Sequence, residues 1–330
     1  MAPPASNFGF SADPGSTGSV CFFPGTTPET AGLTFRWGQE RAAVHAQGQS
    51  LMIDLPSTHL AGEAVEAWGL PPERQLHRVA GYTLLQGEGW TLGAATLPVT
   101  AADLEARTQQ AYAAIFGLLQ GQSLYRCWNW VPRINEVPAG SIECYRLFSR
   151  GRSEAFLAAF AEEAEARMPA ASAVGVPGDQ LVVVFLAGQW PCRYWENPEQ
   201  TPAFHYPEQY GPRAPSFSRA TSVQTPFGRR LFISGTASIR GSESLFLDDL
   251  ERQAWITAQN LELVAHTAGF GREIVDPDGL RAFRCYLRSP EGTAAWGRRW
   301  PQIWPVRSVT QAEVCRAELL IEIEGVLAGV

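Results

Sequence analysis

The chain has 330 residues, a length that predicts about two domains, each able to bury a core of its own. A composition of 45% hydrophobic and 18% charged residues excludes a disordered chain. The formal net charge of −7 excludes a general binder of nucleic acid or of anionic membranes, although it leaves room for a local basic pocket. All 26 basic residues are arginines, and the absence of lysine excludes Schiff-base and lysine-nucleophile chemistry.

Targeting and metal-binding signals are weak along the chain. The longest apolar run, Leu181–Ala187, has the length of a buried strand and is far shorter than the ~20 residues of a membrane span. The N-terminal residues lack a basic region followed by an apolar one, so we expect no secretory signal and a cytoplasmic protein. The 6 cysteines and 5 histidines are dispersed without metal-ligand spacing. We therefore expect reduced thiols, no metal and no cofactor.

In chain order, the first ~30 residues are rich in Gly, Pro, Ser and Thr and are typical of an irregular arm. A strand is predicted to end over Trp90–Thr96, and a helix is predicted from Asp103 to Leu119, where Asp103 suits an N-cap. Another strand is predicted around Tyr125–Trp130. The longer run Leu181–Ala187 adds a buried strand to these elements.

The same succession of elements returns in the second half. A strand is predicted over Leu231–Ser238, a helix from Asp249 to Val264, and a strand around Phe283–Leu287. Three short sequence matches between the two halves fall in the same order, which favours an internal duplication of one α+β unit over chance similarity. We expect two domains, 1–150 and 151–330.

A stretch dense in arginine and aromatic residues lies between these units. The prolines within Phe204–Arg219 predict a rigid loop. His205 lies in this loop, and a surface or hydrogen-bonded histidine is the favoured interpretation over a functional one. The last strand is predicted over Ala317–Val326, where alternation places Glu322 and Glu324 on one face and the isoleucines on the other.

The motifs of common enzyme families are missing, but the C-terminus is informative. No G-x-S-x-G, G-x-G-x-x-G, Walker or H-E-x-x-H motif occurs. The segment Pro305–Ser308 contains Arg307, which precedes Glu322 by 15 residues. This pairing resembles the closing signature of the reactive-intermediate deaminases. The resemblance implies an α+β fold, also described as chorismate-mutase-like, in which each unit is a mixed sheet with helices packed on one face.

The whole chain is similar to a more specialised branch of that fold. The segments 125–136, 150–156 and 210–215, in a chain of two units, resemble the chorismatases over roughly residues 70–328. This resemblance implies chorismate as the substrate and its cleavage to pyruvate and 3-hydroxybenzoate. It also implies that the first unit is largely structural and that the second carries the catalytic residues. The oligomeric state stays open between monomer and trimer.

Two catalytic residues follow from the resemblance. Glu322 occupies the family's acid position and would protonate the enolpyruvyl ether, which requires a carboxylic acid whose pKa is raised by burial. Without the family position, an amphipathic strand would favour a solvent-facing Glu322. Cys315 matches the branch that forms 3-hydroxybenzoate, where a cysteine aids the ring chemistry after the ring hydroxyl captures the oxocarbenium ion. Glu324 is interpreted as a structural glutamate.

The substrate is a dianion, and the forked guanidinium group of arginine suits its two carboxylates. Arg307 matches the carboxylate-binding arginine of the wider family, and Arg213 is the second choice. Four further residues are plausible hydroxyl, ring or charge partners: Tyr145, Arg150, Tyr206 and Tyr210. Small residues at Gly235 and Ala237 would leave room for a ring near the end of a strand, although tight strand packing explains them equally well.

Three other functions remain open at this point. A simple hydrolytic chorismatase would give a dihydroxycyclohexadiene carboxylate and pyruvate, and another branch gives mixed 3- and 4-hydroxybenzoate. A non-catalytic binding protein of the same fold would bind aromatic carboxylates without turnover. An enamine or imine deaminase would release ammonia from imino acids, but it leaves the loop rich in arginine and aromatic residues unexplained.

Overall fold

A computed structural model of the chain describes residues 22–24, 31–276, 280–293 and 306–329. Within them the strands form three large sheets. In spatial order, the five-stranded sheet contains β1 (Phe23–Pro24), β6 (Val65–Gly69), β2 (Leu33–Trp37), β4 (Ser50–Leu55) and β3 (Ala43–Gln47). The six-stranded sheet contains β11 (Ala170–Val176), β10 (Ser123–Pro132), β12 (Gln180–Gly188), β9 (Trp90–Pro98), β8 (Tyr82–Gly87) and β7 (Gln75–Val79). The seven-stranded sheet contains β13 (Cys192–Trp195), β14 (Ala220–Thr225), β15 (Gly228–Thr236), β20 (Ile321–Gly329), β18 (Leu280–Leu287), β19 (Val306–Gln311) and β5 (His59–Gly62).

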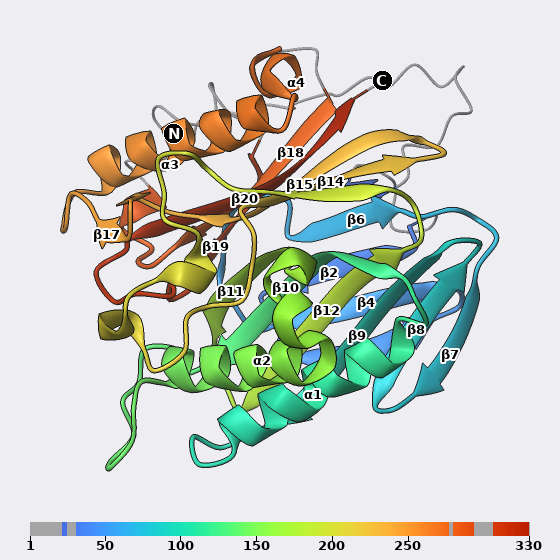
Figure 1. The fold of residues 1–330 in the computed structure, drawn as a ribbon, viewed down its shortest axis with the longest axis horizontal. Coiled ribbons are helices and arrows are strands. Elements are labelled where there is room, and N and C mark those ends of the chain that lie inside the picture. The colour runs from blue at the N-terminus through green and yellow to red at the C-terminus, as the bar shows by residue number, and fades with distance from the viewer. Residues whose placement is uncertain (1–21, 25–30, 277–279, 294–305, 330) are drawn as a thin grey trace, which may run out of the picture.

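Helices cover the outer faces of two of these sheets (Figure 1). Helices α1 (Leu104–Leu118) and α2 (Cys144–Phe160) pack on the six-stranded sheet, and α3 (Leu250–Thr267) and α4 (Gly271–Val275) pack on the seven-stranded sheet. Helix α3 starts where expected, because the Asp249 carboxylate accepts a hydrogen bond from the Arg252 amide at 3.0 Å. The arrangement of mixed sheets with helices on one face confirms the expected α+β class.

The two larger sheets share one topology, which confirms the duplication. The order β7-β8-β9-β12-β10-β11 of the first unit corresponds strand by strand to β13-β14-β15-β20-β18-β19 of the second. In both units the two strands at one edge run parallel, β10 with β11 and β18 with β19. In both units the strand that comes last in the sequence lies antiparallel between two earlier strands: β12 lies between β9 and β10, and β20 lies between β15 and β18.

The expected boundary at residue 150 falls inside helix α2. Strands β11 and β12 then pair with the two sides of β10 and complete the six-stranded sheet, which therefore extends to Gly188. We propose that the chain divides near Gln189, with the second unit starting at β13. The expected run Leu181–Ala187 is the centre of β12, as predicted.

Two further differences concern the ends of the chain. The sequence analysis assigned no element to residues 31–69, where the five-stranded sheet lies; these short strands bury nearly every residue and so lack period-two alternation. The last strand starts at Ile321 rather than Ala317, because the chain turns at residues 315–318 before the ladder begins. The expected N-terminal arm lies almost entirely outside the described residues.

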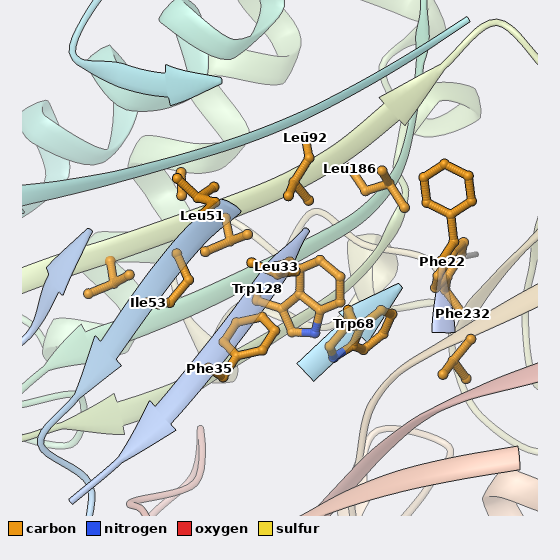
Figure 2. Packing of buried hydrophobic residues seen from close by; sticks show 14 of the residues in the cluster. Phe22, Leu33, Phe35, Leu51, Ile53, Trp68, Leu92, Trp128, Leu186 and Phe232 are labelled. Atoms are coloured by element: carbon orange, nitrogen blue, oxygen red, sulfur yellow. The ribbon is translucent and has the colours of Figure 1, made fainter. Parts of the chain in front are cut away.

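The three sheets enclose one central apolar core. Figure 2 shows its aromatic centre, where Phe35 and Trp68 from the five-stranded sheet meet Trp128 from β10. Phe35 and Trp128 pack with ring centroids 5.9 Å apart, and Trp68 meets Trp128 edge to face at 5.6 Å. Phe232 of β15 joins the same cluster from the seven-stranded sheet. This core fixes the two units relative to each other and so fixes the site that lies between them.

Candidate active site

Glu322 is the second residue of β20, where it pairs with Tyr286 of β18, and the next residue, Ile323, pairs with Thr236 of β15. Its side chain is buried at the junction of the two units. Gly235 of β15 lies directly against it: a Cβ added to this glycine would be 1.9 Å from Oε1 of Glu322. The Gly235 amide donates a 2.9 Å hydrogen bond to the Ser172 hydroxyl of β11, in the other unit. Any side chain at position 235 would displace the carboxyl group.

A small inner cavity of about 30 Å³ surrounds the Glu322 carboxyl group. Its walls come from α2, β11, the loop before β14, β15, β20 and the segment between β19 and β20. They are lined by Tyr145, Phe148, Ser149, Arg152, Ala171, Ser172, Ala173, Pro215, Ser216, Phe217, Gly235, Cys315 and Glu322. A space of this size holds about two water molecules.

A larger outer cavity of about 360 Å³ adjoins it. The outer cavity is lined by Glu143, Tyr145, Arg146, Tyr206, Gln209, Tyr210, Pro215, Cys315, Arg316, Ala317 and Glu318. Tyr145, Pro215 and Cys315 line both cavities, so these three residues form the passage between them. The outer cavity has the volume of a small-ligand pocket, and the inner one is its dead end beside the acid.

The environment of Glu322 favours its neutral form. Burial, followed by the charge of the nearby Glu324, raises the pKa of Glu322 to about 8, against the opposing effect of Arg126. The group is therefore largely a protonated carboxylic acid at neutral pH. Such a group can deliver a proton to a bound molecule.

Cys315 shares the inner cavity with Glu322. Burial, followed by the effect of the Glu322 charge, raises the pKa of the Cys315 thiol to about 12. The sulfur is therefore a neutral thiol at physiological pH rather than a thiolate. The structure thus brings together the two residues that the sequence analysis named as catalytic.

Arg152 of α2 is a cavity residue that the sequence analysis did not single out. Its side chain is buried and lies over the ring of Tyr112 at 4.8 Å, yet its Nε and Nη2 atoms have no hydrogen-bond partner among the described residues. The nearby hydroxyl groups of Ser149 and Ser216 are also buried and unpartnered. Unpaired buried donors are costly, so this group of donors suits an anionic ligand.

The spacing of α2 contained a signal for this residue. Tyr145, Ser149 and Arg152 are separated by four and three residues, so they share one helix face. The choice of Tyr145 as a site residue therefore implied its neighbours on that face. Arg150, which was expected at the site, lies on another face of the helix and pairs with Glu105.

Arg316, next to Cys315, is the second arginine that was missed. Its guanidinium group stacks on Tyr210 at 3.7 Å and lies 5.2 Å from the ring of Tyr206. One side of the group is held by the Ser242 carbonyl at 2.8 Å and the Ser244 hydroxyl at 3.1 Å. The two tyrosines were expected at the site, and the structure places them in the outer cavity.

A network of buried charges lies behind Glu322. Glu324 accepts hydrogen bonds from Arg126 of β10 and from Arg284 of β18, both at 2.7 Å. Arg284 also pairs with Glu66 of the five-stranded sheet at 2.7 Å, and Arg126 donates to the Ser172 hydroxyl at 2.5 Å. The expectation that Glu324 is structural agrees with its position between two arginines.

The remaining expected site residues lie outside the two cavities. Arg307 pairs with Glu63 of the loop after β5 at 2.5 Å, and Arg213 pairs with Glu154 of α2 at 2.9 Å.

Arg150 pairs with Glu105 of α1. Ala237 packs in a small cluster with Ile239, and Cys315 packs against that cluster. His205 lies on the surface, 3.2 Å from the Glu165 carboxylate, as expected of a surface or hydrogen-bonded histidine.

Within the described ranges, no set of three or more His, Cys, Asp or Glu side chains is arranged to hold a metal ion.

Among the helices of the described part of the chain, none combines the length and the apolar composition needed to cross a membrane.

Comparison with known proteins places this site in a family. A family model described as "Chorismatase FkbO/Hyg5-like, N-terminal" matches residues 66–187. A "3-hydroxybenzoate synthase" of Streptomyces hygroscopicus is 34% identical over 284 residues, covering 79% of this chain and 81% of that protein. A "Chorismatase" of Streptomyces rapamycinicus is 31% identical over 313 residues, covering 90% and 89%.

The fold agrees with the sequence comparisons. A crystal structure of a chorismatase at 1.08 Å resolution superposes with a TM-score of 0.78 at 28% identity, covering 92% of this chain and 96% of that one. The two-unit topology, the buried acid between the units and the extent of these matches lead to one assignment: the chain belongs to the chorismatase family.

Proposed function

We propose that this enzyme converts chorismate into 3-hydroxybenzoate and pyruvate. The observation that carries the proposal is the pairing of a protonated Glu322 and a neutral Cys315 thiol in one buried cavity. The names of three relatives, one 3-hydroxybenzoate synthase and two chorismatases, support the same reaction. The reaction needs no net water, because all atoms of chorismate are recovered in the two products.

The first step is a proton transfer from Glu322. The acid protonates the terminal methylene carbon of the enolpyruvyl group, which produces an oxocarbenium ion in the side chain. A carboxyl group whose pKa lies near 8 holds its proton at neutral pH and leaves a carboxylate that stabilises the cation. Burial between the two units keeps bulk water from the cation.

The second step decides the product. When the neighbouring ring hydroxyl adds to the oxocarbenium carbon, it releases its proton and a cyclic ketal forms. The ring carbon's bond to the former hydroxyl oxygen then breaks, together with the bond between the ketal carbon and the ether oxygen. Pyruvate leaves with the former hydroxyl oxygen, and the ether oxygen stays on the ring and takes up a proton. Loss of the proton from the ring carbon that bears this oxygen gives 3-hydroxybenzoate. Glu322 is now a carboxylate, and it can accept this proton directly or through the Cys315 thiol beside it. Cys315 also fills the space from which water would attack.

The substrate carboxylates are assigned to arginines of the cavities. Arg152 has two unpaired donors in the inner cavity, and Arg316 lines the outer one. We give them the role that the sequence analysis expected of Arg307 and Arg213, because those two are paired with acids outside the cavities. The inner cavity is too small for the whole substrate, so the reacting ether lies there and the rest extends into the outer cavity.

Both units of the chain supply walls of this site. The first unit contributes α2 and β11, and the second contributes the acid and the thiol. By strand pairing, Val184 of β12 occupies the position in the first unit that Glu322 occupies in the second. We therefore propose one active site per chain and a first unit that serves as its wall.

Incubation of the purified protein with chorismate tests the function. Pyruvate is followed by a coupled lactate dehydrogenase assay, and the aromatic products are separated by chromatography. We expect pyruvate and 3-hydroxybenzoate in equal amounts. A dihydroxycyclohexadiene carboxylate in place of 3-hydroxybenzoate would reject the subtype, and the absence of pyruvate would reject the function and favour a binding protein.

A further inference from the structure

The segment between β19 and β20, residues 312–320, carries both Cys315 and Arg316. Its neighbours in the chain are held by strand ladders, but the segment itself belongs to neither strand. Glu322 pairs with Tyr286 of β18, and the adjacent Ile323 pairs with Thr236 of β15, so the sheet holds Glu322. The position of Cys315 relative to Glu322 must therefore come from contacts outside the sheet.

The Arg288 side chain supplies three of these contacts, on both sides of Cys315. The Gly175 amide and the Gln253 side chain hold the segment at Glu313, Glu318 and Leu320. The Arg288 guanidinium group donates to the carbonyl oxygens of Leu319 at 2.7 Å, Arg316 at 2.7 Å and Val314 at 3.2 Å. The carbonyl groups just before and just after Cys315 thus bind the same Nη2 atom. The planar five-donor fork of arginine is suited to holding several acceptors in one fixed arrangement.

Asn135 from the first unit completes the arrangement. Its Oδ1 accepts a 3.0 Å hydrogen bond from Arg288, and its Nδ2 donates to the Val314 carbonyl at 3.1 Å. The backbone adds the Arg288 amide, which donates to the Leu320 carbonyl at 3.0 Å. The segment that carries the thiol is therefore held from both units.

Arg288 does not line the inner or the outer cavity. It lines a separate cavity of about 520 Å³ on the other side of the segment, together with Arg133 and Asn135. An effect of Arg288 on the reaction must therefore be transmitted through the position of the segment. It is not a catalytic residue.

We propose that Arg288 is a positioning residue that holds the Cys315 thiol beside Glu322 and thereby sets the ratio of 3-hydroxybenzoate to the diol product. The inference rests on the proposed function, since the ratio has meaning only for a chorismatase. Glu322 stays in place without Arg288, because the ladders of β20 hold it. Protonation and pyruvate release therefore depend less on Arg288 than the subsequent ring chemistry does.

The test is Arg288→Met, which keeps an unbranched apolar stem and removes the guanidinium donors. We expect pyruvate release within about tenfold of the native rate, with the fraction of 3-hydroxybenzoate reduced at least fivefold and the diol in its place. Cys315→Ala gives the reference ratio for an absent thiol. Arg288→Lys keeps the charge but not the fork, so it gives an intermediate ratio.

Arg133→Met is the matched control. Arg133 lines the same cavity, but its Nη2 donates to the Val99 carbonyl and not to the segment. Its product ratio stays native. Asn135→Ala removes the other side chain that binds the segment. This variant replaces Arg288→Met in the test if the thermal transition of Arg288→Met shows that it does not fold.

Alkylation of Cys315 by iodoacetamide, followed by mass spectrometry, measures the position of the thiol without any substrate. We expect Arg288→Met to raise the alkylation rate of Cys315 at least fivefold, whereas that of the buried Cys127 and Cys285 stays native. An unchanged product ratio together with an unchanged alkylation rate would overturn the inference. If the native protein released no pyruvate, the proposed function would fall, and the alkylation rates would still decide the positioning role.

Discussion

At the scale of single residues, the site depends on an acid kept in its neutral form. Glu322 is buried beside Glu324, and only Arg126 opposes the resulting rise of its pKa to about 8. The general acid is therefore available over the whole range below that value. The same burial that enables proton transfer costs folding free energy once the group would ionise.

The pH dependence of kcat/KM follows from this pKa. Because the protonated form of Glu322 is the active one, kcat/KM for pyruvate release stays level below about pH 8 and declines above it. The profile is measured with the coupled assay from pH 4.5 to pH 9.5. A decline centred below pH 6 would show that the acid form of Glu322 is not required.

Replacing the acid separates catalysis from stability. Glu322→Gln removes the proton donor, and we expect pyruvate release to fall at least about a thousandfold. In the native protein, the folded state keeps a proton that the unfolded state loses above about pH 4.5, so the native stability decreases from there to about pH 8. The Tm of the variant should therefore exceed the native Tm more at pH 8 than at pH 5. An equal difference at both pH values would contradict the raised pKa.

Gly235 is required by a close approach. In Gly235→Ala the new methyl group would lie 1.9 Å from the Glu322 carboxyl group, so the acid must move. We expect at least a hundredfold loss of kcat. Gly117→Ala on α1, where an added Cβ meets nothing within 4 Å, is the control and should keep native activity. Native kcat in both variants would place the reacting group elsewhere.

At the scale of elements, one face of helix α2 forms a wall of the site. Tyr145, Ser149 and Arg152 lie on this face, while Arg150 on another face pairs with α1. The helix packs on the sheet of the first unit, but this face lines the cavity that also contains Glu322 of the second unit. A helix of the first unit therefore lines the cavity in which we propose that the substrate binds.

Arg152 gives this arrangement a test. Arg152→Met should raise KM for chorismate at least about tenfold and lower kcat less, because the lost interaction is with a substrate carboxylate present in the ground state. Arg150→Met, which removes a surface pair with Glu105, should leave both constants close to native. A native KM in Arg152→Met would assign the carboxylates to other donors.

At the scale of the whole molecule, buried charges connect the three sheets. Glu66 from the five-stranded sheet, Arg284 and Glu324 from the seven-stranded sheet and Arg126 from the six-stranded sheet form one chain of ion pairs. Four aligned charges in an apolar core are stable only in the correct assembly, because each loses water on burial. The network therefore couples the units.

Glu66→Gln tests this coupling. The change leaves Arg284 with one fewer counter-charge in a buried position, and we expect a loss of about 3 kcal/mol in the free energy of unfolding. The native protein should unfold in a single transition that this variant shifts to lower temperature. Arg36 of β2, whose pair with Asp54 is partly exposed, is the control: Arg36→Met should cost about 1 kcal/mol or less. Equal effects of the two changes would contradict the special role of the network.

Local sequence patterns predicted part of the elements and singled out Glu322 as the candidate acid. Helices α1 and α3 follow from their helical spacing. Asp249 caps α3 as expected, whereas the Asp103 side chain makes no capping hydrogen bond to α1. Strands β12 and β20 follow from an apolar run and from alternation. The duplication and the family signature identified Glu322 and Cys315. These features are local, so they can be read along one segment of the chain.

The arginines of the site were decided only by the tertiary structure. Arg307, Arg213 and Arg152 are chemically alike in sequence, and what distinguishes them is whether a carboxylate lies within reach after folding. The boundary between the units likewise depends on the pairing of β11 with β10, a contact between distant residues. In a chain whose positive charge is carried by arginine alone, composition determines the kind of group that can bind an anion, and folding determines which of these groups is left unpaired to do so.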